Sequence, residues 1–232
     1  MAVNLSEVQG ILKELFLLCK TEVAYRVWKR KIRKYGNFCT HSSFKLLEVG
    51  CGLGYFLHHA EKWFPQSELL GLDIHEMALN YAAKHLNRAK LTRHDAHTLP
   101  FDHKTFNLLV ALHVIEHLRE PEKFFSEAKR VLKPEGLLII ATPNPAGIPA
   151  RLLRDKWHSF HTEHISLRAP NQWGEVIKES GFQILEDGTT GLSGFAVLRK
   201  LPLAIINWIP LSIFGYFPWY KGESYMAIAK KK

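Results

Sequence analysis

One short segment, LLEVGCGLGYF at residues 46–56, constrains the fold of this chain more than any other. Its apolar start predicts a buried strand, and three alternating glycines follow at the end of that strand. Glycine lets the backbone turn tightly and approach a ligand closely, and a helix that begins after such a turn presents free N–H groups. The segment therefore predicts a strand, a tight loop and a helix that hold a nucleotide-like ligand. A turn that binds nothing is the alternative.

The spacing of these glycines separates two kinds of nucleotide site. Gly50, Gly52 and Gly54 alternate with single residues. The dinucleotide fingerprint instead has two residues before its last glycine, and Leu57 stands where that glycine belongs. The segment therefore departs from the pattern of dinucleotide-binding proteins.

Short apolar runs alternate with amphipathic stretches along most of the chain after Phe44. This rhythm is typical of βαβ units around a parallel sheet, so we expect an α/β fold. The predicted strands cover residues 45–50, 68–74, 90–95, 107–112, 136–142, 182–187 and 224–230, and the predicted helices cover residues 5–35, 55–64, 76–87, 122–132 and 170–180.

Acidic residues lie at three successive predicted strands. Glu48 belongs to the first strand, Asp73 ends the second in LLGLDIHEMA, and Asp95 ends the third in LTRHDAHTLPF. An acid after the second strand can accept both hydrogen bonds of a ribose diol. Open α/β sheets bind ligands at the carboxyl ends of their strands, so the three acids together predict a ligand site at that edge.

The glycine segment with these acids resembles the first motifs of the class I S-adenosylmethionine-dependent methyltransferases, in particular the small-molecule branch with type 11 or type 23 domains. The resemblance covers roughly residues 44–143. It implies a Rossmann-like, doubly wound sheet of seven strands with an antiparallel last strand. It also implies S-adenosylmethionine as the methyl donor, with S-adenosylhomocysteine as the product.

The same resemblance assigns the residues that bind the cofactor. Glu48 would orient its amino group, Asp73 would hold the ribose, and Asp95 would face the adenine amino group. The full set that the resemblance implies is Glu48, Gly50, Cys51, Gly52, Gly54, Asp73, Ile74, Asp95, Ala96, Leu112 and His113.

The segment FNLLVALHVIEHL at residues 106–118 contains His113, Glu116 and His117, which spell the H-x-x-E-H string of some zinc proteases. The string crosses a predicted junction between a strand and a loop, so a protease site is not expected. Methyltransferases of quinone precursors and of RNA ends resemble this region, with an acid where His113 stands. A divalent metal is compatible with these residue types, but we do not predict a metal site.

Three histidines lie in KWHSFHTEHIS at residues 156–166, where methyltransferases of this kind build the acceptor pocket. A hydroxyl acceptor has to lose its proton, and histidine is the usual base near neutral pH. We therefore predict His164 or His161 as the catalytic base in an O-methylation of a small, apolar acceptor. Histidines that pack the loop or lie at the surface are the alternative.

Two further segments lie outside the motifs described above. Residues 1–43 are predicted as an N-terminal helical extension, either an acceptor lid or a membrane-facing element, and residues 44–232 as the methyltransferase domain. An apolar insert at residues 199–222 precedes the last strand, and its prolines at 202, 210 and 218 argue against a membrane span. Four alternatives remain for this insert: a lid, a patch in the membrane interface, a dimer surface, or part of the core.

The net charge of +9 favours an anionic partner, and peripheral contact with an anionic membrane would satisfy it. The three cysteines form no CxxC pair, which is typical of a reducing compartment, so we expect a cytoplasmic protein. An RNA methyltransferase is an alternative that the charge supports, although no RNA-binding module is recognisable and nucleic acid is not expected as a partner. A cofactor-binding or membrane-associated protein without turnover is the other alternative. No oligomeric state is predicted.

Overall fold

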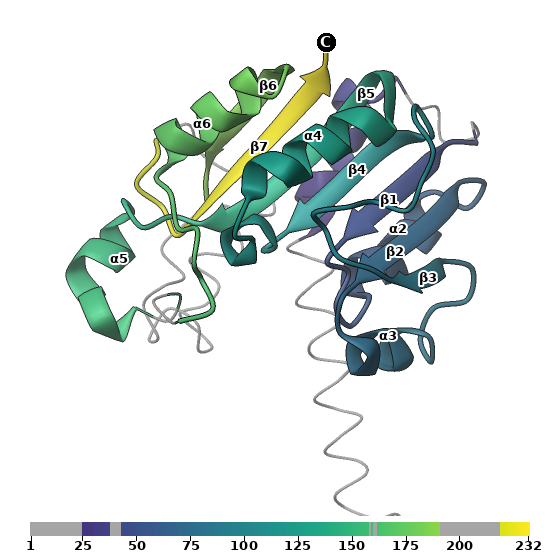
Figure 1. The fold of residues 1–232 in the computed structure, drawn as a ribbon, viewed down its shortest axis with the longest axis horizontal. Coiled ribbons are helices and arrows are strands. Elements are labelled where there is room, and N and C mark those ends of the chain that lie inside the picture. Colours follow the sequence, from purple (N-terminus) through teal and green to yellow (C-terminus); the bar gives the residue numbers. More distant parts are fainter. Residues whose placement is uncertain (1–24, 38–42, 158, 160–161, 191–218) are drawn as a thin grey trace, which may run out of the picture.

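The computed structural model describes residues 25–37, 43–157, 159, 162–190 and 219–232, and its centre is one twisted sheet with helices on both faces (Figure 1). The sheet has seven strands in the order β3-β2-β1-β4-β5-β7-β6. The strands are β1 (Lys45–Val49), β2 (Glu68–Asp73), β3 (Lys90–Arg93), β4 (Phe106–Leu112), β5 (Leu132–Pro143), β6 (Phe182–Thr189) and β7 (Ser224–Lys231).

The pairing of the strands confirms the predicted fold. The strands from β1 to β5 pair in parallel, whereas β7 lies antiparallel to both β5 and β6. From the central strand β1 the chain first builds the sheet toward β3 and then returns to build it toward β6. The strand order therefore reverses between β1 and β4, which is where doubly wound sheets form a ligand crevice.

Helices connect the strands as the sequence predicted, with small differences in length. The helical elements are α2 (Tyr55–Trp63), α3 (Glu76–Ala82), η1 (Ile115–His117), α4 (Pro121–Val131), α5 (Ile148–Leu153), η2 (Arg154–Lys156) and α6 (Pro170–Glu179). The predicted helix 76–87 ends early, at Ala82. The Glu61 carboxylate accepts the backbone N–H groups of residues 87, 88 and 89, and this local alternative replaces helical hydrogen bonds there.

Two apolar clusters form the core, one on each face of the sheet. Neighbouring strand residues point to opposite faces, so Leu46 and Leu108 join one cluster while Leu47 and Leu109 join the other. Helices α4 and α6 cover the second face, and α2 with the helical residues 25–35 covers the first (Figure 1). Burial on both faces explains why the central strands are nearly continuous apolar runs.

The described part of the predicted N-terminal extension packs on the sheet. Residues 25–35 are helical, and Val27, Trp28 and Ile32 on this helix are at most 2% exposed. Lys31 and Tyr35 both contact the carboxylate of Glu186 on β6, and Tyr35 donates a hydrogen bond of 2.5 Å. This helix is therefore part of the sheet's cover.

The remaining segments of interest fall largely outside the described residues. These are residues 1–24 of the predicted extension and residues 191–218, which contain most of the predicted apolar insert. Among the residues that the structure describes, no helix combines the length and apolar character needed to cross a membrane.

Candidate active site

The glycine loop after β1 is held against the neighbouring strand. The backbone N–H groups of Gly50 and Cys51 both donate to the carbonyl oxygen of Leu72, at 2.7 and 3.0 Å. Gly50, Gly52 and Gly54 all have a positive φ, of 69°, 49° and 80°. A Cβ at Gly50 would also lie 2.2 Å from a methyl carbon of Val114, so this position admits no side chain.

Gly54 differs from the other two glycines in what surrounds it. It precedes α2, and a Cβ there would lie 3.0 Å from both Ala82 and Leu86. Gly54 does not line either cavity described below. The structure therefore gives this predicted cofactor residue a place in helix packing.

Asp73 connects the glycine loop to the end of β2. Its carboxylate accepts the backbone N–H groups of Gly52 at 2.7 Å and of His75 at 2.8 Å, and the residue is 7% exposed. Each carboxylate oxygen has a second lone pair, so Asp73 can hold the loop and still accept hydrogen bonds from a diol.

Asp95 follows β3 and has an exposed carboxylate. It accepts hydrogen bonds from the backbone N–H of His97 at 2.7 Å and is 2.6 Å from Nδ1 of the same histidine. The backbone hydrogen bond, and then the side chain of His97, hold the pKa of Asp95 below its usual range despite partial burial. The carboxylate is therefore ionised at neutral pH and available to a polar ligand.

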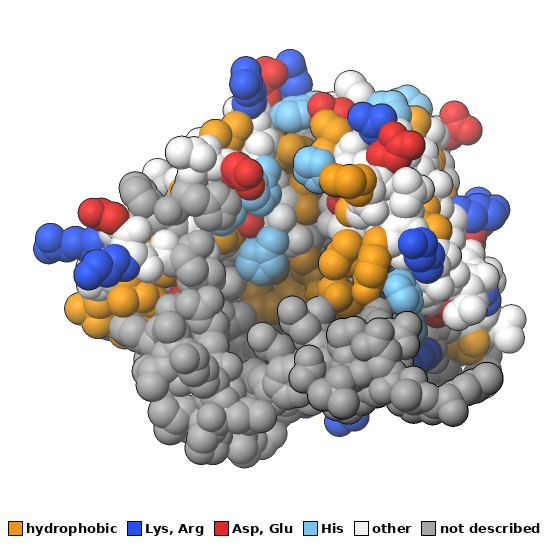
Figure 2. All heavy atoms as spheres, turned by 90° about the horizontal axis from the view of Figure 1, so that it is seen from below, with side chains coloured by type: hydrophobic (Ala, Val, Ile, Leu, Met, Phe, Trp, Pro, Cys, Tyr) orange, Lys and Arg blue, Asp and Glu red, His pale blue; other side chains and the backbone are white. Residues whose placement is uncertain are grey.

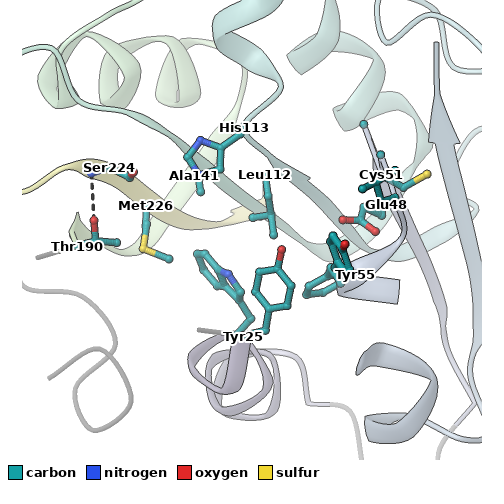
Figure 3. Close-up of a pocket in the computed structure, with 15 residues that line it drawn as sticks. Tyr25, Glu48, Cys51, Tyr55, Leu112, His113, Ala141, Thr190, Ser224 and Met226 are labelled. Atoms are coloured by element: carbon teal, nitrogen blue, oxygen red, sulfur yellow. Dashed lines mark hydrogen bonds between the residues drawn. The ribbon is translucent and has the colours of Figure 1, made fainter. Parts of the chain in front are cut away.

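Two cavities open at the edge that carries the carboxyl ends of β1 and β4, where histidine side chains surround an apolar hollow (Figure 2). The larger, of about 860 Å³, is lined by Asp73, Ile74, Asp95 and Ala96. The smaller, of about 350 Å³, is lined by Glu48, Cys51 and Leu112 (Figure 3). Gly50, Gly52 and His113 line both. Every predicted cofactor residue except Gly54 thus borders one cavity or both.

Glu48 is the least expected feature of the smaller cavity. It lies in the middle of the sheet between Gly71 and Val110, is 4% exposed, and its Oε2 has no hydrogen-bond partner among the described residues. Burial, with the charge of Asp73, raises its pKa well above the usual value. A buried carboxylate with an unpaired oxygen at a cavity wall is a receptor for a cationic donor such as an ammonium group.

The opposite wall of the smaller cavity comes from distant parts of the chain. Tyr25 and Trp28 line it from the helix at residues 25–35. Met226 lines it from β7, and Figure 3 shows Tyr25 and Met226 at the cavity. Burial, together with the charge of Glu48, raises the pKa of the Tyr25 hydroxyl, so it stays protonated. None of these three residues belongs to a recognisable motif, and only tertiary packing brings them to the site.

Cys51 lines the same cavity but is not suited to act as a nucleophile. It is 5% exposed, and burial, with the charges of Glu48 and Asp73, raises the pKa of its thiol. The thiolate is the reactive form of cysteine, and it is not populated here.

His113 occupies a strained position where β4 ends. Its φ is 58°, in the left-handed region, and its backbone N–H donates to the carbonyl of Ala141 at 2.7 Å. Its Nδ1 is 3.4 Å from Oε1 of Glu116, which is completely buried. Backbone strain of this kind is found at functional sites when the surrounding structure enforces it. Glu116 was not among the predicted site residues.

The predicted base His164 lies beside His117, with the ring centroids 4.6 Å apart. Nδ1 of His164 is 2.6 Å from the carbonyl oxygen of Ser159, and Nδ1 of His117 is 3.0 Å from that of Glu163. His117 lines the larger cavity, as do Glu163 and Ile165 on either side of His164. The other predicted base, His161, lies outside the described residues.

The strand order and the two cavities at the glycine loop are those expected of the class I S-adenosylmethionine-dependent methyltransferases. Residues 47–140 match the family described as "Methyltransferase domain".

Known proteins agree with this assignment. The chain is 26% identical over 195 residues to a probable S-adenosylmethionine-dependent methyltransferase of Mycolicibacterium smegmatis, covering 84% of this chain and 69% of that protein. It is 25% identical over 161 residues to the demethylmenaquinone methyltransferase of Thermotoga maritima, covering 60% of this chain and 70% of that one. A crystal structure of an S-adenosylmethionine-dependent methyltransferase from Mesorhizobium loti has the same fold, with a TM-score of 0.64, 17% identity, and coverage of 90% and 98%.

Proposed function

We propose that this chain transfers the methyl group of S-adenosylmethionine to a hydroxyl group of a small, apolar acceptor. The observation that carries the proposal is that two cavities of different character meet at the glycine loop and at His113. The larger cavity has the ionised Asp95 and the carboxylate of Asp73, which suit a nucleoside. The smaller has an aromatic wall, which suits an apolar molecule.

The chain's own residues would hold the donor in an extended pose across the two cavities. Asp73 and Asp95 would accept hydrogen bonds from the ribose and the adenine amino group, while Glu48 would receive the amino group of the methionine part. Gly50 and Gly52 leave room for the donor to lie against the backbone. When bound, S-adenosylmethionine supplies an electrophilic methyl group on a sulfonium.

An apolar acceptor is supported by the side chains around the smaller cavity. Tyr25, Trp28, Phe56 and Met226 line it. These side chains exclude water and orient the acceptor, and proximity of this kind lowers a barrier by roughly 7 to 11 kcal/mol. One relative of this chain is named for a small-molecule acceptor, demethylmenaquinone.

Removal of the hydroxyl proton is assigned to the histidine segment, with His164 or His161 as the base. The carbonyl of Ser159 beside Nδ1 of His164 favours the tautomer that carries its proton on Nδ1. Nε2 then has the lone pair that a base needs. The hydroxyl oxygen forms a bond to the methyl carbon, the bond from carbon to sulfur breaks with its electron pair on sulfur, and the hydroxyl proton goes to the histidine.

The proposal is tested in two steps. Calorimetry with S-adenosylhomocysteine measures cofactor binding, and transfer of labelled methyl groups is then screened with phenols, quinols, fatty acids and RNA. We expect transfer to a hydroxyl of an apolar acceptor, and transfer to RNA alone would contradict the proposal. His164→Gln should lower turnover by about 10²- to 10⁴-fold with cofactor affinity unchanged, whereas His103→Gln, at an exposed loop histidine, should leave both unchanged.

A further inference from the structure

Three side chains beside the larger cavity bring metal-binding atoms together. A carboxylate oxygen of Glu116 and ring nitrogens of His117 and His164 all lie within 4.8 Å of one another. Glu116 and His117 belong to η1 after β4, and His164 comes from the segment between η2 and α6. Distant parts of the chain thus converge on one point at the edge of the sheet.

The carboxylate of Glu116 is the strongest sign of a missing partner. The residue is 0% exposed, and neither of its oxygens has a hydrogen-bond partner among the described residues. Nδ1 of His113 lies 3.4 Å from Oε1 of this carboxylate. Burial of a carboxylate without hydrogen bonds is unfavourable, and buried charges are normally paired or bound to a metal.

Both histidines of the cluster are oriented by the backbone. Nδ1 of His117 faces the carbonyl of Glu163, and Nδ1 of His164 faces the carbonyl of Ser159. A histidine that donates its Nδ1–H to a carbonyl presents the lone pair of Nε2, and metal-binding histidines are usually fixed in this way. The backbone carbonyls therefore select the tautomer that a cation requires.

The two segments that supply these residues are also tied to each other. The backbone N–H of Ser166 donates to the carbonyl of Glu116 at 2.9 Å, and its hydroxyl donates to the carbonyl of Leu118 at 2.6 Å. These bonds fix residues 163–166 against η1. The three side chains are consequently held in place before any ligand arrives.

We propose that Glu116, His117 and His164 bind one divalent cation, such as Zn²⁺ or Mn²⁺, at the edge of the larger cavity. Two imidazole nitrogens and one carboxylate are ligands that suit these ions, and three protein ligands leave coordination positions open. His117 is exposed, which gives an ion a path into the site.

This inference rests on the proposed function and refines the part that His164 plays in it. An acceptor hydroxyl that occupies an open position on the cation has a lowered pKa, as water does on a bound metal. His164 then assists loss of the proton by holding the cation, and the hydroxyl proton goes to a water molecule of the solvent. Acceptors that carry a hydroxyl would be preferred over amines, which are protonated near neutral pH.

The experiment uses the full chain without a polyhistidine tag. Zn²⁺ binding is measured by competition with a chelating dye, and Co²⁺ is added separately to record its visible ligand-field absorption. Glu116→Gln, His117→Gln and His164→Gln are compared with the matched exposed controls Glu120→Gln and His103→Gln. Far-ultraviolet circular dichroism and binding of S-adenosylhomocysteine report whether each variant is folded.

We expect wild type and both controls to bind one ion per chain with the same affinity. Each of the three ligand variants should lose about 100-fold or more of that affinity while still binding the cofactor product, because loss of a ligand exceeds the effect of losing its supporting contacts. Equal affinity and equal Co²⁺ absorption in wild type and in all three folded variants would overturn the cation site. A wild type that binds the ion but methylates no acceptor would overturn the proposed function and leave the cation site standing.

Discussion

The carboxylate of Asp73 accepts a hydrogen bond of 2.7 Å from the backbone N–H of Gly52, which links the end of β2 to the glycine loop after β1. The same carboxylate accepts the N–H of His75 at 2.8 Å. Asp73 therefore shapes the loop in addition to any contact with the ribose. Two contributions to cofactor affinity, loop geometry and direct contact, depend on this one side chain.

Substitution of Asp73 should separate these contributions. Asp73→Asn keeps an oxygen that can accept the Gly52 N–H but loses the charge, and Asp73→Ala loses both. Because hydrogen bonds to charged groups are worth about 1.5–3 kcal/mol, we expect affinity for S-adenosylhomocysteine to fall about 10-fold or more in Asp73→Asn and further in Asp73→Ala. Calorimetry measures both, and equal affinity in the two variants would show that the loop does not depend on the carboxylate.

The two loop glycines should respond differently to alanine. A Cβ at Gly50 would meet Val114 at 2.2 Å, whereas a Cβ at Gly52 meets nothing within 4 Å. Gly52→Ala should therefore cost only the strain of its positive φ, about 1–2 kcal/mol of unfolding free energy, and Gly50→Ala should cost more. Urea unfolding measures these costs. Val114→Ala combined with Gly50→Ala should recover part of the loss, and no recovery would place the clash elsewhere.

Glu48→Gln is expected to stabilise the cofactor-free protein and to weaken cofactor binding. Removal of a buried carboxyl group whose charged form is disfavoured should raise the free energy of unfolding by about 1–3 kcal/mol near neutral pH. Loss of the receptor for an ammonium group should lower cofactor affinity. Thermal unfolding and calorimetry measure the two effects, and the exposed Glu120→Gln should change neither.

The raised pKa of Glu48 also predicts how the stability of the folded chain depends on pH, and a pH titration of the stability can check the direction. Because its pKa is higher in the folded chain, the folded chain binds this proton more tightly than the unfolded chain does. Stability should fall as pH rises above about 4.3, the value of an ordinary glutamate, toward the folded pKa. Glu48→Gln should remove this part of the slope. A slope equal to that of wild type would contradict the assignment.

Glu186 should produce the opposite dependence. Burial raises its pKa, but the hydrogen bonds from Lys31 and Tyr35 and the charge of Lys31 outweigh it, so the folded pKa lies below the usual value. The stabilisation is fully present above the pKa of the unfolded chain and is lost as pH falls through the folded pKa. Acid should therefore loosen the helix at residues 25–35, which amide hydrogen exchange can follow, and Glu186→Gln should loosen it at neutral pH.

Much of this architecture could be predicted from the sequence, because the information was local. Apolar runs with burial on both faces predicted all seven strands, and the acids Asp73 and Asp95 lie where strand ends meet. The role of Gly54 in packing could not be predicted, because the sequence does not distinguish a glycine that lies close to Ala82 from a glycine that lies close to a ligand.

The less predictable residues depend on contacts between distant segments. Tyr25 reaches Glu48's cavity from a helix that lies before the recognisable motifs. Glu116 was not selected as a site residue because its burial depends on tertiary packing. His164 lies beside it because the segment around Glu163 folds back onto η1, where the carbonyl of Glu163 contacts Nδ1 of His117, 46 residues earlier in the chain. The spacing of residues within one segment does not predict contacts between side chains of distant segments.

The two walls of the smaller cavity have different origins in the chain. The wall with Glu48 and Cys51 belongs to the glycine segment, whereas Tyr25, Thr190 and Met226 come from outside residues 47–140 (Figure 3). Changes in the outer segments can therefore alter which methyl acceptor binds, while the residues of the glycine segment that would hold the methyl donor stay the same. Grafting such segments between relatives is a route to new specificity that leaves the glycine segment and its acids intact.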